Sequence, residues 1–266
     1  MKIGFIGTGN MGGALARAAA KGGHTLLLAN RTPAKAEALA KELGGTVCPN
    51  AEAAEKAELL FLGVKPQGLP GLAGELAPVL QARKGNAPVV VSMAAAVTLR
   101  ELDAMLGRGL PLIRIMPNTP AAVGAGTILY AAQNVTDAQL NAFRAVLAQA
   151  GLLLPLPEAQ IDAASAISGC GPAFCFQFAD ALALGGVRAG LSYPDACRLA
   201  AQTMLGAAEM LLQGGEAPDV LKMRVCSPAG TTIEGVLALE QGGFSYTVQN
   251  AVTAAYRRTV EMTRKG

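Results

Sequence analysis

The chain has 266 residues, of which 52% are hydrophobic and 15% are charged, and its formal net charge is +3. This composition supplies enough apolar side chains for a large core and excludes a disordered chain. The small net charge without a long basic run gives no reason to expect a nucleic-acid partner, and the five cysteines, none in C-x-x-C spacing, predict neither a disulfide framework nor a metal site.

Short apolar runs alternate with helical patterns through the first half of the chain. Runs typical of buried strands lie at 2–7, 24–30, 58–64, 88–93, 110–116 and 127–132. Helices are predicted from 10 to 21 and after Pro33, and capping boxes predict helix starts at Thr98 and Thr136. Strands that alternate with helices pair in parallel through right-handed crossovers. The pattern therefore predicts an α/β fold with a Rossmann-type, doubly wound, mostly parallel sheet.

The strand pattern ends with residues 151–157, and the remainder has helical patterns separated by glycine and proline. We therefore expect a Rossmann domain at 1–155 and an all-helical domain at 156–266. The apolar faces of the helical domain carry many small residues, which suit close packing inside the domain or across a dimer.

No segment is expected to span a membrane. The uncharged stretch 115–136 contains prolines and asparagines, and the apolar stretch 163–179 is interrupted by SGCGP. The apolar run at the N-terminus ends in Gly-Thr-Gly-Asn without a cleavage-like site. We therefore expect a cytoplasmic protein.

The segment GFIGTGNMGGAL places Gly7, Gly9 and Gly12 between the first predicted strand and the first predicted helix. Gly7 allows a tight turn, Gly9 lets the backbone approach a pyrophosphate, and Gly12 allows the helix to pack closely on the strand. Phosphates would then lie at the helix N-terminus. The segment therefore predicts a dinucleotide site. The residues between the glycines, Thr8, Asn10 and Met11, are expected to line it as well.

The end of the second predicted strand indicates which dinucleotide binds. NAD sites usually carry an acidic residue there, but the first acidic residue of this chain is Glu37. Asn30, Arg31 and Thr32 offer a positive charge and hydrogen-bond donors instead, which suit a 2′-phosphate. NADPH is therefore the expected cofactor, with NADH as the second choice. The alternative is that Arg31 is a surface cation and Thr32 only caps a helix.

Few groups in the chain can act in acid–base catalysis. The single histidine, His24, starts the second predicted strand, away from the expected ligand edge. No lysine lies between Lys84 and Lys222, so the helix GPAFCFQFADALALGG lacks the catalytic lysine that β-hydroxyacid dehydrogenases carry there. A reductase without strong acid–base groups suits a substrate that is already activated, such as a cyclic imine.

The segment RVCSPAGTTIEGVLALE, residues 224–240, places hydroxyls and a glycine just before a helical pattern. Ser227, Gly230, Thr231 and Thr232 offer hydroxyls and free N–H groups at a helix N-terminus, which suit an anion. The alternative is an ordinary capped helix after a turn. An imine that carries a carboxylate would place its anion there, with a hydroxyl beside its ring.

These motifs together resemble the pyrroline-5-carboxylate reductases over essentially the whole chain. The similar segments are GFIGTGNMGGAL, ANRT, FLGVKPQ, MPNTP, AISGCGPAFCFQFADAL and VCSPAGTTIEGVLALEQGGF. The resemblance implies NADPH-dependent reduction of 1-pyrroline-5-carboxylate to L-proline, with hydride transfer to the imine carbon. It also implies a homodimer through the helical domain, often assembled further into decamers.

The resemblance also implies roles for the site residues. Ser227 and the N–H groups of Gly230 and Thr231 would hold the substrate carboxylate, and the Thr232 hydroxyl would approach the ring nitrogen. The implied cofactor contacts are Asn50 on the adenine side and a loop made of Val64, Lys65 and Pro66. From the residues alone, Lys65 suits a solvated loop equally well.

Three positions depart from the family pattern: Ala96 and Ala229 stand where glycine is usual, and Cys170 where serine is usual. An alanine whose turn requires a positive φ costs about 1 kcal/mol. Two other functions stay open, namely reduction of a related imine or hydroxyacid and non-catalytic nucleotide sensing. The intact SPAGTT segment disfavours a sensor, which needs no second site for a small anion.

Overall fold

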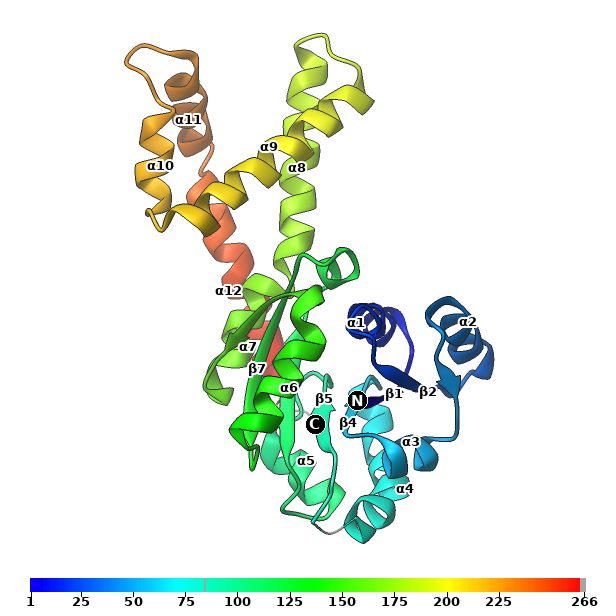
Figure 1. The fold of residues 1–266 in the computed structure, drawn as a ribbon. Helices are drawn as coiled ribbons and strands as arrows, with labels where there is room; N and C mark the ends of the chain where they lie inside the picture. The colour runs from blue at the N-terminus through cyan, green and yellow to red at the C-terminus, as the bar shows by residue number, and fades with distance from the viewer. Residues whose placement is uncertain (84, 264–266) are drawn as a thin grey trace. The chain divides into compact units, whose positions relative to one another are not determined.

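The structure, a computed structural model, describes residues 1–83 and 85–263. The N-terminal part contains a sheet with the strand order β3-β2-β1-β4-β5-β6-β7-β8 (Figure 1). The strands are β1 (Lys2–Ile6), β2 (Thr25–Ala29), β3 (Thr46–Val47), β4 (Leu59–Leu62), β5 (Val89–Ser92), β6 (Leu112–Pro117), β7 (Gly126–Gln133) and β8 (Gly151–Pro155).

Helices connect most of these strands. The α-helices are α1 (Asn10–Ala20), α2 (Pro33–Leu43), α3 (Asn50–Lys56), α4 (Leu69–Ala82), α5 (Leu99–Leu106), α6 (Asp137–Leu147) and α7 (Glu158–Ser168), and the short 3₁₀ helices are η1 (Pro66–Gly68), η2 (Thr119–Val123) and η3 (Ala148–Ala150). Both predicted capping boxes are present, since the Thr98 and Thr136 hydroxyls accept hydrogen bonds from the N–H groups of Glu101 and Gln139.

The strand pairing confirms the predicted mostly parallel, doubly wound sheet. All pairs from β3 through β6 are parallel, and so is the pair β7–β8. The exception is β7, which runs antiparallel to β6. Residues 118–125 are the whole connection between these two strands, and a parallel crossover needs a dozen or more residues.

The central strands β1, β4 and β5 are buried on both faces, which explains why they are apolar along nearly their whole length. One core cluster combines Ile3 and Phe5 with side chains of α1, α2 and α6. The other combines Ile6 and Leu60 with side chains of α3, α4, α5 and α7. Along β1, successive side chains therefore enter opposite cores, as the alternation of a strand requires.

The chain divides into two compact units. The sheet unit contains Met1–Gly169 and the described end of α12 from Tyr256, and the helical unit contains Cys170–Ala255. The helices after α7 are α8 (Gly171–Arg188), α9 (Tyr193–Gly214), α10 (Pro218–Arg224), α11 (Thr231–Gln241) and α12 (Phe244–Thr263).

The first helix of the predicted helical domain, α7, belongs by its packing to the sheet unit. Its Ile161 is fully buried in the same core cluster as the strands. The boundary at residue 155 therefore stays a prediction about domains, whereas the compact units meet between Gly169 and Cys170. Residues 264–266, at the end of the predicted helical domain, lie outside the described residues.

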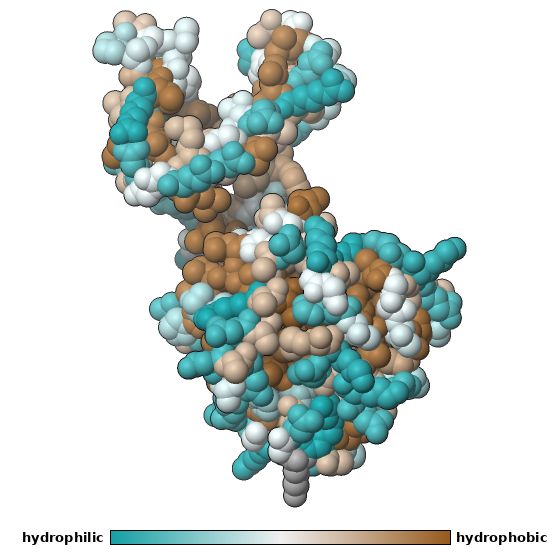
Figure 2. All heavy atoms as spheres, in the orientation of Figure 1, coloured by the Kyte–Doolittle hydropathy of each residue, from teal (hydrophilic) through white to brown (hydrophobic). Residues whose placement is uncertain are grey.

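The helical unit buries very little apolar surface by itself. Among its described residues, the buried hydrophobic side chains are Ala183, Ala196 and Ala200. Large apolar side chains such as Phe176 and Leu212 are 70% and 79% exposed, and Figure 2 shows apolar surface along these helices. A unit of this kind requires an apolar partner surface to be stable.

One stretch of the described residues, Glu158–Arg188, is long and apolar enough to cross a membrane by length and composition. Length and composition alone do not make it a membrane span, and 6% of its apolar window is buried within the described residues. The SGCGP segment interrupts the stretch as expected, because α7 ends at Ser168 and α8 begins at Gly171.

Candidate active site

The turn between β1 and α1 has the geometry that its glycines predict. Gly7 has a φ of +96°, and its N–H donates to the Ala29 carbonyl at 2.8 Å. A Cβ on Gly7 would lie 2.5 Å from the Gly63 carbonyl oxygen, and a Cβ on Gly12 would collide with the Gly7 carbonyl oxygen. Apart from its own residue and its neighbours along the chain and helix, no described atom lies within 4 Å of the position that a Cβ on Gly9 would take. Gly7 and Gly12 therefore close the turn, while Gly9 faces open space.

The same turn leaves hydrogen-bonding groups for an anion. Thr8 is 8% exposed, and its hydroxyl is buried without a hydrogen-bond partner among the described residues. Helix α1 begins after Gly9 with no side-chain cap and no acidic residue in its first turn, which contains Asn10 and Met11. Buried polar atoms normally have partners, so an unpaired hydroxyl beside an uncapped helix N-terminus fits a bound phosphate. The residues present therefore fit the pyrophosphate of a dinucleotide.

Asn30 joins the turns that follow β1 and β2. Its Oδ1 accepts a hydrogen bond from the Thr8 N–H at 3.1 Å, and its Nδ2 donates to the Thr32 carbonyl at 3.0 Å. The sequence did not indicate this role in holding two loops together. Arg31 and Thr32 are exposed beside it, which leaves the Arg31 charge accessible to a 2′-phosphate.

The loop after β4 lies directly against the glycine turn. The Gly63 N–H donates to the Ile6 carbonyl at 2.7 Å, so the ends of β4 and β1 are held together. In the residues that follow, Val64 and Pro66 are half-buried and Lys65 is exposed. The loop that the resemblance assigns to the cofactor therefore borders the phosphate-binding turn.

Asn50 is the first residue of α3, which follows β3. Its Nδ2 donates to Glu75 Oε2 at 3.0 Å. The predicted cofactor residues thus follow the carboxyl ends of the parallel strands β1 to β4. That edge of a doubly wound sheet is where ligands bind, next to the point at which the strand order reverses between β1 and β4.

The predicted substrate residues lie in the helical unit, in the loop between α10 and α11 and at the start of α11. The Gly230 N–H donates to the Ser227 carbonyl at 3.0 Å, and a Cβ on Gly230 would collide with the Ser227 hydroxyl. Ala229 has a φ of +56°, so this loop has the positive φ for which glycine is the better residue. Helix α11 begins at Thr231 without a side-chain cap, and the Ser227, Thr231 and Thr232 side chains are exposed.

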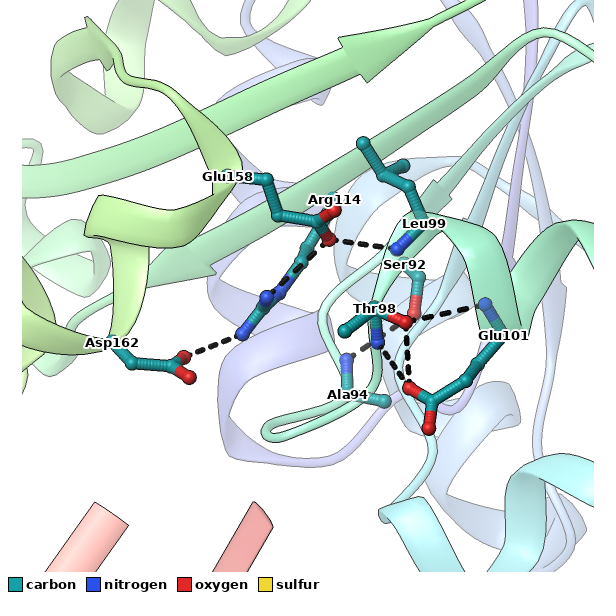
Figure 3. Close-up of polar contacts among 8 residues, drawn as sticks. All are labelled: Ser92, Ala94, Thr98, Leu99, Glu101, Arg114, Glu158 and Asp162. Carbon is teal, nitrogen blue, oxygen red and sulfur yellow. Dashed lines mark hydrogen bonds and ion pairs between the residues drawn. The ribbon is translucent and has the colours of Figure 1, made fainter. Parts of the chain in front are cut away.

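A buried charge network, which the sequence prediction missed, adjoins the cofactor edge (Figure 3). Arg114 on β6 has a side chain that is 5% exposed, and it pairs with Glu158 at 3.3 Å and with Asp162 at 2.6 Å. Glu158 also accepts a hydrogen bond from the Leu99 N–H at 2.7 Å. The available signal was an arginine inside a predicted buried strand, combined with two carboxylates spaced four residues apart on one helix face.

The sheet order and the glycine turn define a dinucleotide-binding protein of the Rossmann class. Full-length relatives include the pyrroline-5-carboxylate reductase of Synechocystis, which is 39% identical over 100% of this chain and 99% of that protein, and the enzyme of Pseudomonas aeruginosa, which is 38% identical over 98% and 96%. The chain belongs to the pyrroline-5-carboxylate reductase family.

Family models and solved structures agree with this membership. A model described as pyrroline-5-carboxylate reductase dimerisation matches residues 158–262, and one described as NADP oxidoreductase, coenzyme F420-dependent, matches residues 2–96. A pyrroline-5-carboxylate reductase from Coxiella burnetii has a TM-score of 0.90 at 32% identity and covers 97% of each chain. The Plasmodium falciparum enzyme with NADP bound has a TM-score of 0.85 at 30% identity and covers 99% of this chain and 98% of that one.

Proposed function

We infer that this chain reduces 1-pyrroline-5-carboxylate to L-proline with NAD(P)H, the last step of proline biosynthesis. The protein is thus an oxidoreductase that acts on a CH–NH group. The observation that carries this inference is the 38–39% identity to reductases of the family over essentially the full length of both chains. The glycine turn and the unpaired Thr8 hydroxyl provide the matching dinucleotide site.

The cofactor is held, in our proposal, by the carboxyl edge of the sheet. The phosphates lie at the N-terminus of α1, and the Arg31 charge binds the 2′-phosphate, which favours NADPH over NADH. When bound, the reduced nicotinamide supplies the hydride that the imine carbon receives. The proposed cofactor-binding residues are Gly7, Thr8, Gly9, Asn10, Met11, Gly12, Asn30, Arg31, Thr32, Asn50, Val64, Lys65 and Pro66.

The substrate carboxylate binds, in our proposal, to the Ser227 hydroxyl and to the N–H groups of Gly230 and Thr231. The Gly230 N–H then exchanges its hydrogen bond to the Ser227 carbonyl for one to the substrate. These groups lie at the uncapped N-terminus of α11, where the helix dipole favours an anion. Thr232, one residue further along α11, places its hydroxyl at the substrate ring nitrogen. It orients the proton at that nitrogen and does not act as a strong acid.

We propose that the protein is a homodimer through its helical domain, with a decamer as a further assembly. The support is the match to the dimerisation model and the exposed apolar side chains of the helical unit. Phe174, Phe178, Leu182, Phe244 and Val248 line an apolar groove on that unit, which suits a helix of a partner subunit.

The oligomeric state can be tested with one variant and one control. Phe176, on α8 but outside the lining of the groove, is 70% exposed, so Phe176→Ser should shift the protein toward smaller species in size-exclusion chromatography with light scattering. Val47→Ser, at a 40% exposed position on β3, should leave the mass unchanged. A monomeric wild-type protein would contradict the proposal.

Family membership supports a soluble enzyme with a small-molecule substrate, and we propose that it acts in the cytoplasm without a nucleic-acid or membrane partner. The apolar stretch Glu158–Arg188 falls within the part of the chain that matches the dimerisation model. Burial against a partner subunit accounts for its hydropathy without a bilayer. Recovery of the full chain in the membrane fraction of expressing cells would contradict this assignment.

The activity is tested by following the absorbance of NADPH with purified protein and 1-pyrroline-5-carboxylate. Parallel reactions contain NADH in place of NADPH, or a simple 2-keto acid in place of the imine. Rapid oxidation with the imine alone, faster with NADPH, is the expected result. Tight NADPH binding without turnover of the imine would contradict the substrate assignment.

A further inference from the structure

Arg114 on β6 carries a charge that is buried in the sheet unit. Arg114 lies opposite Ser92 in the β5–β6 register, and its guanidinium is almost entirely removed from solvent. Both of its carboxylate partners, Glu158 and Asp162, come from successive turns of α7. A buried charge is tolerated only when it is paired and hydrogen-bonded, so α7 supplies what Arg114 requires.

Glu158 has a second contact that Asp162 lacks. Its Oε1 accepts from Arg114 Nη1 and also from the N–H of Leu99, the first residue of α5 (Figure 3). The first N–H groups of a helix have no partner within the helix. The Thr98–Glu101 capping box pairs the N–H groups of Thr98 and Glu101, and Glu158 pairs the Leu99 N–H from outside the helix.

The segment 93–98, which ends where α5 begins, leaves β5 at the carboxyl edge of the sheet. The Met93 N–H donates to the Leu62 carbonyl at 3.2 Å, and the Ala94 N–H donates to the Ser92 hydroxyl at 3.3 Å. Ala96 has a φ of +60°, which an alanine adopts only where the surrounding contacts hold it. The segment is therefore fixed at one end by β4 and β5 and at the other end by Glu158.

The strand order tells which half of a dinucleotide lies over this segment. In folds of this class the ribose next to the adenine binds at the end of the second strand, here β2, on one side of the switch point between β1 and β4. The second nucleoside extends to the other side of the switch point, toward the ends of β4 and β5. The segment 93–98 consequently lies on the nicotinamide side of the cofactor edge.

We propose that Glu158, oriented by Arg114, is a positioning residue that holds the segment 93–98 in place for the nicotinamide half of the dinucleotide. The proposal rests on the proposed function only in that the ligand is a dinucleotide. Arg114 orients the Glu158 carboxylate, and the carboxylate holds the start of α5 through the Leu99 N–H.

The test measures the binding of two ligands by calorimetry, without substrate: NADPH, and 2′,5′-adenosine diphosphate, which lacks the nicotinamide half. Glu158→Ala should weaken NADPH binding by about tenfold, because the hydrogen bond to Leu99 is lost, and should change the affinity for the fragment by less than about twofold. Glu158→Gln retains an oxygen that can accept from the Leu99 N–H, so it should keep the NADPH affinity within about threefold of the wild-type value.

Asp162→Ala is the matched control, because it removes the shorter ion pair of Arg114 but no contact with α5. It should lower the melting temperature while leaving the ratio of the two affinities unchanged. The proposal is overturned if Glu158→Ala weakens both ligands equally, or if Asp162→Ala changes the ratio as much as Glu158→Ala does. Turnover of 1-pyrroline-5-carboxylate by the wild-type enzyme tests the proposed function separately.

Discussion

Replacing Ala96 by glycine should stabilise the sheet unit. Ala96 has a φ of +60°, in the left-handed region where a Cβ crowds the following carbonyl and costs roughly 1–2 kcal/mol. Glycine removes that cost but gives the unfolded chain more freedom, which costs about 0.4–1 kcal/mol. The balance is a net stabilisation of about 0.5–1 kcal/mol, equivalent to a rise of roughly 1–4 °C in the melting temperature for a chain of this size.

Ala95 provides the control in the same turn. It is half-buried like Ala96, and it is absent from the positive-φ residues of the described chain. Ala95→Gly therefore relieves no strain and should destabilise the protein by about 0.4–1 kcal/mol. Thermal unfolding of both variants and the wild type, at one protein concentration and without cofactor, gives the comparison. Melting temperatures that fall equally in the two variants would refute the strain argument.

Three further predictions concern the site and its surroundings. Thr232→Ala should lower kcat by roughly 100-fold while leaving the NADPH affinity unchanged. Thr231→Ala keeps its backbone N–H and should retain most activity. Equal kcat values for both variants in steady-state kinetics would remove Thr232 from the mechanism. Arg31→Ala should raise KM for NADPH far more than KM for NADH, since only NADPH carries the 2′-phosphate; parallel increases would refute the role of Arg31. Hydrogen bonds from the Thr98 N–H and hydroxyl hold the pKa of Glu101 in the folded protein below its usual value. The ionised Glu101 therefore contributes fully to the free energy of unfolding above its ordinary pKa of about 4.3. This contribution is lost as the pH falls through the lower pKa of the folded protein. Urea unfolding from about pH 6 to about pH 3 should therefore show a smaller loss of stability for Glu101→Gln than for the wild type, and identical slopes would contradict this account.

The elements that follow from local chemistry were predictable from the sequence. The β1–α1 turn needs glycine at Gly7 because of its positive φ and at Gly12 because of the Gly7 carbonyl, and both requirements are visible in the motif. The capping boxes at Thr98 and Thr136 are equally local. Continuous apolar runs located the strands that are buried on both faces, whereas the short, exposed strand β3 had no such run and was not predicted.

The features that were missed depend on contacts between distant residues. The antiparallel direction of β7 follows from the length of the 118–125 connection and not from the apolar pattern of the strand. Asn30 was expected to face the cofactor, but its amide also joins two loops, a contact that requires the folded backbone. The packing of α7 with the sheet unit depends on its contacts with Arg114, because Glu158 and Asp162 follow Arg114 by 44 and 48 residues in the sequence.

The origin of the Arg114 partners limits how this protein can be divided into independently folding pieces. A fragment cut at residue 155, where the strand pattern ends, would lack Glu158 and Asp162 and would leave a guanidinium in the sheet interior without a counter-charge. An unpaired buried charge of this kind costs roughly 3–5 kcal/mol, a large share of the stability of an ordinary domain. A nucleotide-binding fragment intended for separate expression must therefore extend through Gly169.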